Sequence, residues 1–211
     1  MSGMRGLYRF GRRFCQLFFL FFCRGRVFGT ARVPRTGGVL LLCNHQSFLD
    51  PVLATVALPR ECHYMARDTL FKVGWLKPIL EAFNSFPIKR DAADLRGIRE
   101  ALRRLTHGAL VTAFPEGTRS PDGSIGALHA GVVLLARRAR VPMVPCVVLG
   151  AYRAWPRGAH LPRPAPVIVA YGEPLWPDSF TGRSDDELIG EVRRRICELH
   201  ARYSGHPLLR R

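Results

Sequence analysis

The sequence predicts a single α/β domain with a largely parallel central sheet flanked by helices. A chain of 211 residues is long enough for one hydrophobic core and shorter than the roughly 250 residues beyond which chains divide. Hydrophobic residues make up 47% and charged residues 23%, which excludes disordered and low-complexity architectures. Short apolar runs alternate with amphipathic segments, and this alternation favours parallel strands joined by helices.

Each element is predicted from its local pattern. The expected strands are the short apolar runs at 39–43, 109–114, 143–149 and 167–171. The expected helices are 49–58, 94–107, 130–139 and one that begins after Ser184. In segment 94–107 apolar side chains recur every three or four residues, with Asp94 placed to cap its start. Ser184 and Glu187 have the spacing of a capping box.

The most apolar stretch is residues 14–23, and six phenylalanines lie between Phe10 and Phe22. As a helix this stretch would reach about 15 Å, half of the roughly 30 Å hydrocarbon core, so we expect it to lie in the membrane surface. The flanking arginines expected to face lipid phosphates are Arg12, Arg13, Arg24 and Arg26. The alternative is a helix packed on the core. We expect residues 1–30 to anchor the chain and 31–211 to form the main domain.

The charge is the unusual feature of the composition. Lys and Arg number 32 against 16 Asp and Glu, giving a net charge of +16. Such a surface attracts anions, and composition alone leaves nucleic acid, anionic lipid headgroups and phosphorylated substrates open. Six cysteines show no C-x-x-C pair, so we expect free thiols in a reducing compartment. Cys43 and Cys146 lie in apolar runs and are predicted to be buried rather than catalytic.

Two polar motifs follow predicted strands. In N-H-Q-S-F-L-D, residues 44–50, His45 and Asp50 can meet only if His45 lies in a turn and Asp50 in the first helical turn. A carboxylate on one imidazole nitrogen would leave the other nitrogen as a base. Taken alone, the pair also fits a capping aspartate beside a surface histidine. The second motif is F-P-E-G-T-R-S, residues 114–120, and loops at strand ends gather at one sheet edge, so we expect one shared site.

The sequence lacks the motifs of several other enzyme classes. The sequence has no G-x-S-x-G, Walker-type, H-E-x-x-H or G-x-G-x-x-G motif. No two of the seven histidines have close metal-ligand spacing, so no metal is expected and a metal-dependent hydrolase is a weak alternative. F-P-I-K-R, residues 86–90, ends in adjacent cations suited to holding a phosphate.

Taken in order, these motifs resemble the glycerolipid acyltransferase family, most closely the 1-acyl-sn-glycerol-3-phosphate acyltransferases. The resemblance covers about residues 39–172, with A-R-D-T-L-F-K from Ala66 and V-P-x-V-P from Val141 as further blocks. It implies the family's α/β acyltransferase fold for 31–211, with an N-terminal membrane-associated helical segment. It also implies acyl transfer from acyl-CoA or acyl carrier protein, with no other cofactor, to a lysophospholipid hydroxyl, giving phosphatidic acid from 1-acyl-sn-glycerol-3-phosphate.

By this resemblance His45 is the catalytic general base, held by Asp50, and no acyl-enzyme is needed. The residues implied to bind substrate are Asn44, Ser47, Arg90, Glu116, Gly117, Thr118 and Arg119. The expected location is the cytoplasmic face of the cell membrane, peripheral or monotopic, with anionic lipids as partners. Nucleic acid is not expected, because the aromatic residues concentrate in the N-terminal segment.

One departure from the family concerns the acceptor. Family members commonly carry a lysine where this sequence has His129. A fixed cation thus becomes a titratable one. An ornithine lysolipid or another lysophospholipid is therefore the alternative acceptor.

Overall fold

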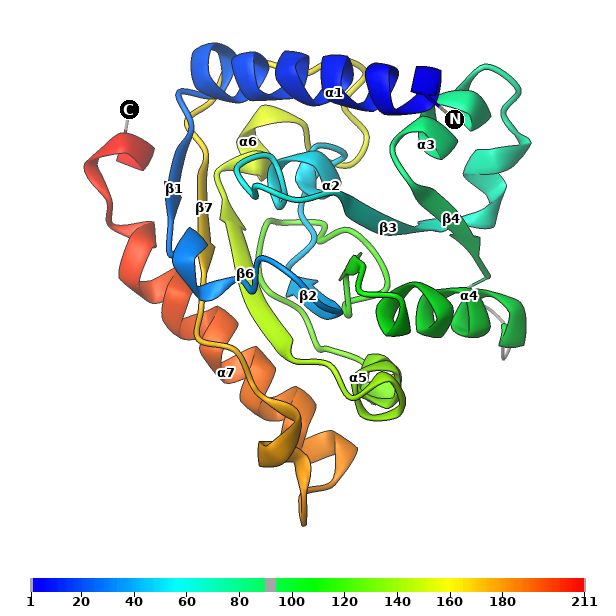
Figure 1. Cartoon of the computed structure of the whole chain (residues 1–211). Helices are drawn as coiled ribbons and strands as arrows, with labels where there is room; N and C mark the ends of the chain where they lie inside the picture. The colour runs from blue at the N-terminus through cyan, green and yellow to red at the C-terminus, as the bar shows by residue number, and fades with distance from the viewer. Residues whose placement is uncertain (1, 90–93, 211) are drawn as a thin grey trace.

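The computed structural model describes residues 2–89 and 94–210 and is built around a seven-stranded sheet (Figure 1). In spatial order the strands are β1 (Arg26–Phe28), β7 (Ile168–Tyr171), β6 (Met143–Leu149), β2 (Val39–Cys43), β5 (Leu110–Ala113), β3 (Cys62–Arg67) and β4 (Ser85–Ile88). Neighbouring strands run parallel except β6 and β7, which are antiparallel. The predicted α/β class with a largely parallel sheet is confirmed.

Helices cover both faces of the sheet. They are α1 (Ser2–Leu17), α2 (Asp50–Leu53), α3 (Leu76–Ala82), α4 (Leu95–Thr106), α5 (Val133–Ala139), α6 (Ala151–Ala154) and α7 (Asp185–Ser204). Short 3-10 turns occur at Thr30–Arg32 (η2), Asp68–Lys72, Ala130–Val132, Pro177–Phe180 (η5) and Pro207–Arg210. The helices α4, α5 and α7 share one core with Leu40 and Leu42, while α2 and the end of the N-terminal helix pack on Leu41. Strand β2 is therefore buried on both faces, which explains its unbroken apolar sequence.

The local patterns located most elements correctly. The predicted strands correspond to β2, β5, β6 and β7, and both predicted helix caps, Asp94 and the Ser184–Glu187 capping box, are present. The strands β1, β3 and β4 were not predicted, because each is only partly buried and carries polar residues among its apolar ones. The predicted division at residue 30 places β1, which pairs with β7, on the anchor side of the boundary.

The predicted helix 49–58 is wrong in length, since α2 ends at Leu53 and turns follow. The carbonyl groups of Val56 and Leu58 accept hydrogen bonds from side chains of α1 instead of continuing a helix. Packing against another element thus overrides the local pattern.

The N-terminal helix has a polar inner face. It comprises α1 and a continuing π-helical turn, Phe18–Phe22. Tyr8, Arg12 and Gln16, four residues apart, hydrogen-bond to the backbone of residues 56–62. The expectation that Arg12 faces the bilayer is therefore wrong, because its guanidinium reaches the carbonyl groups of Leu58 and Arg60. Arg13 is exposed.

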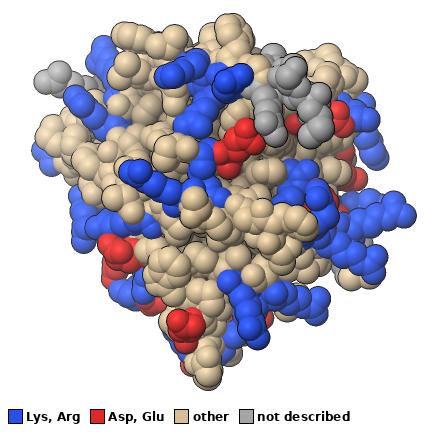
Figure 2. Space-filling model, viewed as in Figure 1, with Lys and Arg blue, Asp and Glu red and all other residues tan. Residues whose placement is uncertain are grey.

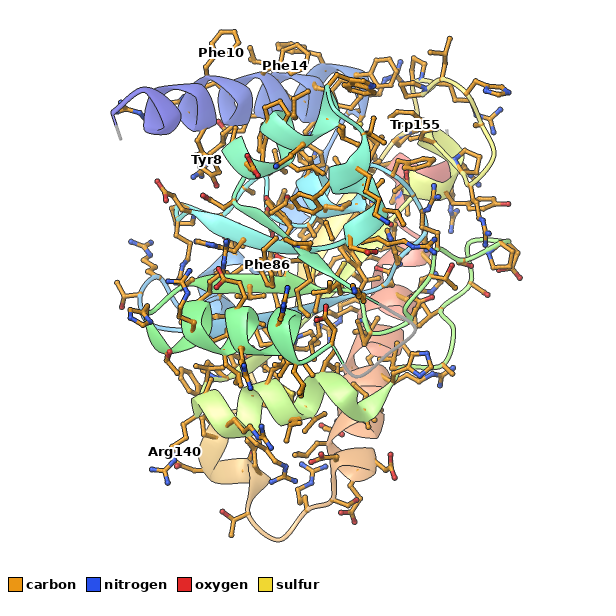
Figure 3. All side chains as sticks on the ribbon, turned by 90° about the vertical axis from the view of Figure 1, so that its right-hand side faces the viewer. Tyr8, Phe10, Phe14, Phe86, Arg140 and Trp155 are labelled. Carbon is orange, nitrogen blue, oxygen red and sulfur yellow. The ribbon has the colours of Figure 1, made fainter. Side chains whose placement is uncertain are left out.

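The opposite face of the same helix is apolar and exposed. It carries Phe10, Phe14, Leu17, Leu20 and Phe21, the first and last of which are 73% and 74% exposed. Figure 3 shows Phe10 and Phe14 pointing away from the domain while Tyr8 points into it. In the described part of the chain, no helix has the length and apolar character needed to cross a membrane. Basic side chains are spread over much of the face seen in Figure 2.

All six cysteines are free thiols, and Cys43 and Cys146 are fully buried, as predicted. Burial raises the pKa of Cys23 to about 11 and of Cys62 to about 12. Thiols with such pKa values are poor nucleophiles at neutral pH because almost none is ionised. Cys23 and Cys62 thus act as small core residues.

A matched pair of glycine substitutions tests the fold. Gly150 joins β6 to α6 at a φ of +83°, and a Cβ there would lie 2.0 Å from the Pro166 carbonyl oxygen. Gly150→Ala should lower the free energy of unfolding by about 2 kcal/mol or more, measured by urea denaturation. Gly190→Ala, in the exposed middle of α7 with open space around it, should instead raise it by about 0.5–1 kcal/mol. Equal effects would contradict this backbone assignment.

Candidate active site

The turn after β2 brings His45 and Asp50 into contact. The Nδ1 atom of His45 lies 2.9 Å from Oδ2 of Asp50, which is the first residue of α2. The same carboxylate oxygen accepts hydrogen bonds from the backbone N–H groups of Gln46 at 2.5 Å and Ser47 at 2.6 Å. His45 therefore lies in the turn and Asp50 at the start of the helix, as the five-residue spacing required.

Burial and hydrogen bonding act in opposite directions on the Asp50 carboxyl. Burial raises the pKa of the Asp50 carboxyl, and its hydrogen bonds with His45 and the backbone N–H groups of Ser47 and Gln46 oppose that shift. An ionised Asp50 accepts the Nδ1 proton, so Nε2 of His45 carries the lone pair. The His45 ring stacks on Phe114 at 4.3 Å between centroids, and 12% of its side chain is exposed. This geometry suits a general base whose Nε2 faces a substrate hydroxyl.

Three residues predicted to bind substrate hydrogen-bond to the backbone of the chain itself. Asn44 is fully buried, and its side-chain amide exchanges two hydrogen bonds with the backbone of Val148 in β6. Ser47 is also fully buried, and its hydroxyl donates to the Trp155 carbonyl and accepts from the Leu49 N–H group. Both side chains position the turn that carries His45, and their contact with substrate stays a prediction.

Glu116 is the third of these residues. Its two carboxylate oxygens accept hydrogen bonds from the backbone N–H groups of His45 at 2.9 Å and Gly126 at 3.3 Å. Burial raises its pKa, and these two backbone hydrogen bonds oppose the shift. Glu116 thus ties the two motifs together, and its contact with substrate stays a prediction.

The second motif lies beside the first, as predicted. The Ser120 N–H group donates to the His45 carbonyl at 2.7 Å. Gly117 has a φ of +69°, which favours glycine, and Thr118 is exposed. The Arg119 guanidinium lies 3.5 Å above the Phe48 ring. Gly117, Thr118 and Arg119 are accordingly placed next to His45, whereas Arg90 lies outside the described residues.

Several residues at the site were missed from the sequence. Phe114 supports the His45 ring, and Phe48 packs between Arg119 and Trp155. Their aromatic side chains give no local signal of function, because any of them would also suit a core. The exposed His129 lies beside the E-G-T-R turn: its N–H group donates to the Pro115 carbonyl, and a Cβ on Gly117 would lie 3.4 Å from its ring.

With the fold and site defined, the chain can be placed among known proteins. The acyltransferase family pattern matches residues 24–149, so the chain belongs to the acyltransferase family. It is 29% identical over 179 residues to 1-acyl-sn-glycerol-3-phosphate acyltransferase of Bacillus subtilis, covering 82% of this chain and 87% of that protein. It is 36% identical over 153 residues to the enzyme of that name from Limnanthes alba, covering 71% of this chain and 54% of the plant protein.

A solved structure is also similar. The crystal structure of the 1-acyl-sn-glycerophosphate (LPA) acyltransferase PlsC from Thermotoga maritima matches with a TM-score of 0.78 and 25% sequence identity. The match covers 96% of this chain and 81% of that one. The fold predicted from the sequence resemblance is therefore the one observed.

Replacing Asp50 by asparagine tests whether its charge is needed for activity and whether that charge stabilises the fold. Asp50→Asn keeps an oxygen that can accept from the two backbone N–H groups and from Nδ1, but it removes the negative charge that would stabilise an imidazolium on His45, so kcat should fall about 10²–10⁴-fold. Because burial raises the pKa of Asp50, its ionised form costs stability above the folded-state pKa, and asparagine removes that charge. The melting temperature should thus stay the same or rise. Retained activity would contradict the role, and Asp178→Asn, at an exposed site, is the control.

Proposed function

We propose that this protein transfers a fatty acyl group from a thioester, acyl-CoA or acyl carrier protein, to a lysophospholipid hydroxyl. The foremost acceptor is 1-acyl-sn-glycerol-3-phosphate, which would give phosphatidic acid. The observation that carries the proposal is the His45–Asp50 pair, which leaves Nε2 available beside the E-G-T-R turn. The names of the relatives and of the similar structure support the same reaction.

In the proposed mechanism Nε2 of His45 removes the proton of the acceptor hydroxyl as its oxygen attacks the thioester carbonyl. The tetrahedral intermediate then collapses and the C–S bond breaks. The leaving sulfur takes the proton from His45, so a thiol departs and the neutral base is restored. Asp50 stabilises the transient imidazolium and keeps the ring oriented. No acyl-enzyme forms and no cofactor is required in this scheme.

The acceptor's phosphate is assigned to the E-G-T-R turn. Arg119 can pair with two phosphate oxygens, Thr118 adds an exposed hydroxyl, and the sequence adds Arg90 as a further cation. His129 next to Gly117 takes the position where relatives commonly carry lysine. A lyso-ornithine lipid or another lysophospholipid therefore remains the alternative acceptor.

Membrane attachment is assigned to the N-terminal helix, with residues 1–30 as the anchor and 31–211 as the acyltransferase domain. The outer face of the N-terminal helix carries Phe10, Phe14 and Phe21, and these exposed side chains support insertion into the acyl boundary of the membrane. The exposed Arg13, Arg24 and Arg26 can bind anionic lipid headgroups. A helix packed into a core would bury this face, so the exposed phenylalanines favour the membrane role. The free thiols fit the cytoplasmic face.

Loss of the base should remove activity. His45→Ala should reduce thiol release from acyl-CoA in the presence of lysophosphatidic acid by at least about 10²–10⁴-fold. Thiol release is followed with a thiol-reactive dye, and His107→Ala, at the exposed end of α4, should leave it unchanged. Unchanged release by His45→Ala would refute the mechanism. Repeating the assay with ornithine lysolipid distinguishes the two acceptors.

The outer face of the N-terminal helix should determine membrane binding. Phe10→Ser, Phe14→Ser and Phe21→Ser together remove three side chains worth about 1.5 kcal/mol or more each when buried. Sedimentation with vesicles of phosphatidylcholine and phosphatidylglycerol should show at least about 100-fold weaker binding. Trp176→Ser removes another exposed aromatic, just before η5, and should have no effect. Equal binding by the triple variant and wild type would rule out this face.

A further inference from the structure

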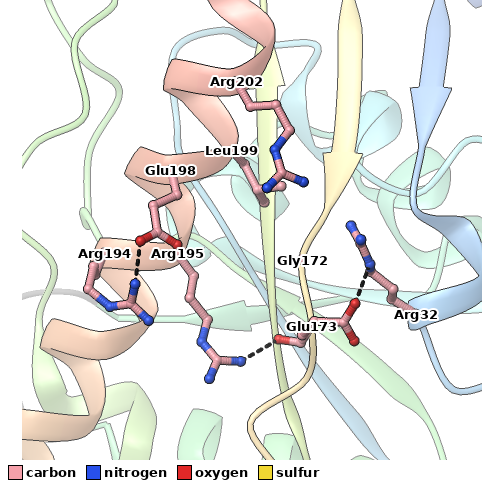
Figure 4. A pocket seen from close by; sticks show the side chains of 8 residues that line it. All are labelled: Arg32, Gly172, Glu173, Arg194, Arg195, Glu198, Leu199 and Arg202. Atoms are coloured by element: carbon pink, nitrogen blue, oxygen red, sulfur yellow. Dashed lines mark hydrogen bonds and ion pairs between the residues drawn. The ribbon is translucent and has the colours of Figure 1, made fainter.

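A cavity lined by charged side chains lies outside the candidate active site. It has a volume of about 280 Å³ and lies between α7, the η2 turn and the residues that follow β7 (Figure 4). Its lining residues are Arg32, Gly172, Glu173, Arg194, Arg195, Glu198, Leu199 and Arg202. Nothing in the proposed acyl transfer uses these side chains.

The position of the cavity separates it from His45. Gly172 follows β7 and hydrogen-bonds to Pro145 in β6, whereas His45 follows β2, on the other side of β6. The helix α7 covers the sheet face opposite α2, which carries Asp50. In Figure 1, α1 lies along the top of the molecule and η2 lies well below it. A headgroup in the membrane that α1 contacts is therefore poorly placed to enter this cavity.

The arginines of the cavity differ in how many of their guanidinium N–H groups are hydrogen-bonded. Arg194 is fully engaged, because its guanidinium donates to Glu191 and Glu198. Arg195 donates through Nε to Glu191 and through Nη1 to the Glu173 carbonyl, which leaves its Nη2 group available. Arg32 likewise uses Nε on the Glu173 carboxylate and Nη1 on the Tyr171 carbonyl.

Arg202 is the fourth arginine of the cavity. Within the residues that the structure describes, its guanidinium makes no hydrogen bond or ion pair, and Figure 4 shows it turned into the space between α7 and Arg32. Arg195 and Arg202 are seven residues apart on α7, so they lie on one face of the helix. Three guanidinium groups on two elements thus offer free N–H groups to one cavity.

We infer that this cavity binds a water-soluble phosphate monoester dianion. Four arginines and two glutamates line it, so the lining carries a net charge of +2. A phosphate monoester carries about −1.5 to −2 at pH 7 and accepts several charge-assisted hydrogen bonds. A volume of 280 Å³ exceeds the roughly 30 Å³ share of a water several-fold, so a phosphate group with a small substituent fits. This site goes beyond the proposed function.

Inorganic phosphate is the probe for the site. We would titrate it at pH 8 into the full chain and into Arg202→Gln, and follow binding by calorimetry. Arg202 makes no contact that the fold needs among the described residues, so the variant should fold normally and bind phosphate at this cavity at least about tenfold more weakly. Arg138→Gln, which removes one exposed charge from α5, should bind as wild type.

Two further variants distinguish the cavity from the candidate active site. Glu198→Gln raises the charge of the lining by one and should tighten binding several-fold. Arg119→Gln alters the E-G-T-R turn and should leave the Arg202-dependent binding intact. Arg202→Gln should leave acyl transfer unchanged, so failure at this cavity is distinguishable from failure of the proposed function.

Three outcomes would overturn the inference. If Arg202→Gln and Arg138→Gln weakened phosphate binding equally, the binding would depend only on the overall charge of the protein. Loss of all phosphate binding in Arg119→Gln would place the anion at the candidate active site alone. The third outcome is that the protein binds phosphatidylcholine vesicles containing phosphatidic acid more tightly than it binds glycerol 3-phosphate, and that this binding depends on Arg202. The ligand would then be a lipid headgroup and not a soluble phosphate.

Discussion

The buried carboxylate of Asp50 is the constraint on which the candidate site depends. A fully buried anion is tolerable only with several hydrogen-bond donors, and one of its oxygens receives three, from His45 and from two backbone N–H groups of the turn. Those donors fix both the path of residues 45–47 and the orientation of the imidazole. Asn44 and Glu116 secure the same turn from its two sides, through β6 and through the E-G-T-R motif.

The motif residues therefore divide by accessibility into two groups. Asn44, Ser47 and Glu116 direct their polar atoms at backbone groups, and they determine where His45 stands. Thr118 and Arg119 remain at the surface of the site, where a phosphorylated acceptor could meet them. A motif can thus contain as many positioning residues as reacting ones, since a base is effective only when held within hydrogen-bond reach of its substrate.

The N-terminal helix is the proposed link between a membrane surface and this scaffold. It hydrogen-bonds through Tyr8, Arg12 and Gln16 to residues 56–62, the segment that directly follows the helix of Asp50. Its amphipathicity is inverted relative to a core helix, because the polar side chains face the protein and the phenylalanines face outward. Such an arrangement is stable when the outer face finds an apolar environment of its own.

The α/β class, the strands β2, β5, β6 and β7 and the capped helices followed from the residues alone, because local periodicity and capping are set by neighbouring residues. The spacing of His45 and Asp50 allowed a catalytic pair but also a capping aspartate beside a surface histidine, and the family resemblance favoured the pair. The inward turn of Arg12, the backbone hydrogen bonds of Asn44 and Glu116, and the grouping of Arg32 with Arg195 and Arg202 depend on tertiary packing. Those contacts join residues distant in the chain, and the direction of a polar side chain follows from the backbone groups that packing leaves unsatisfied beside it.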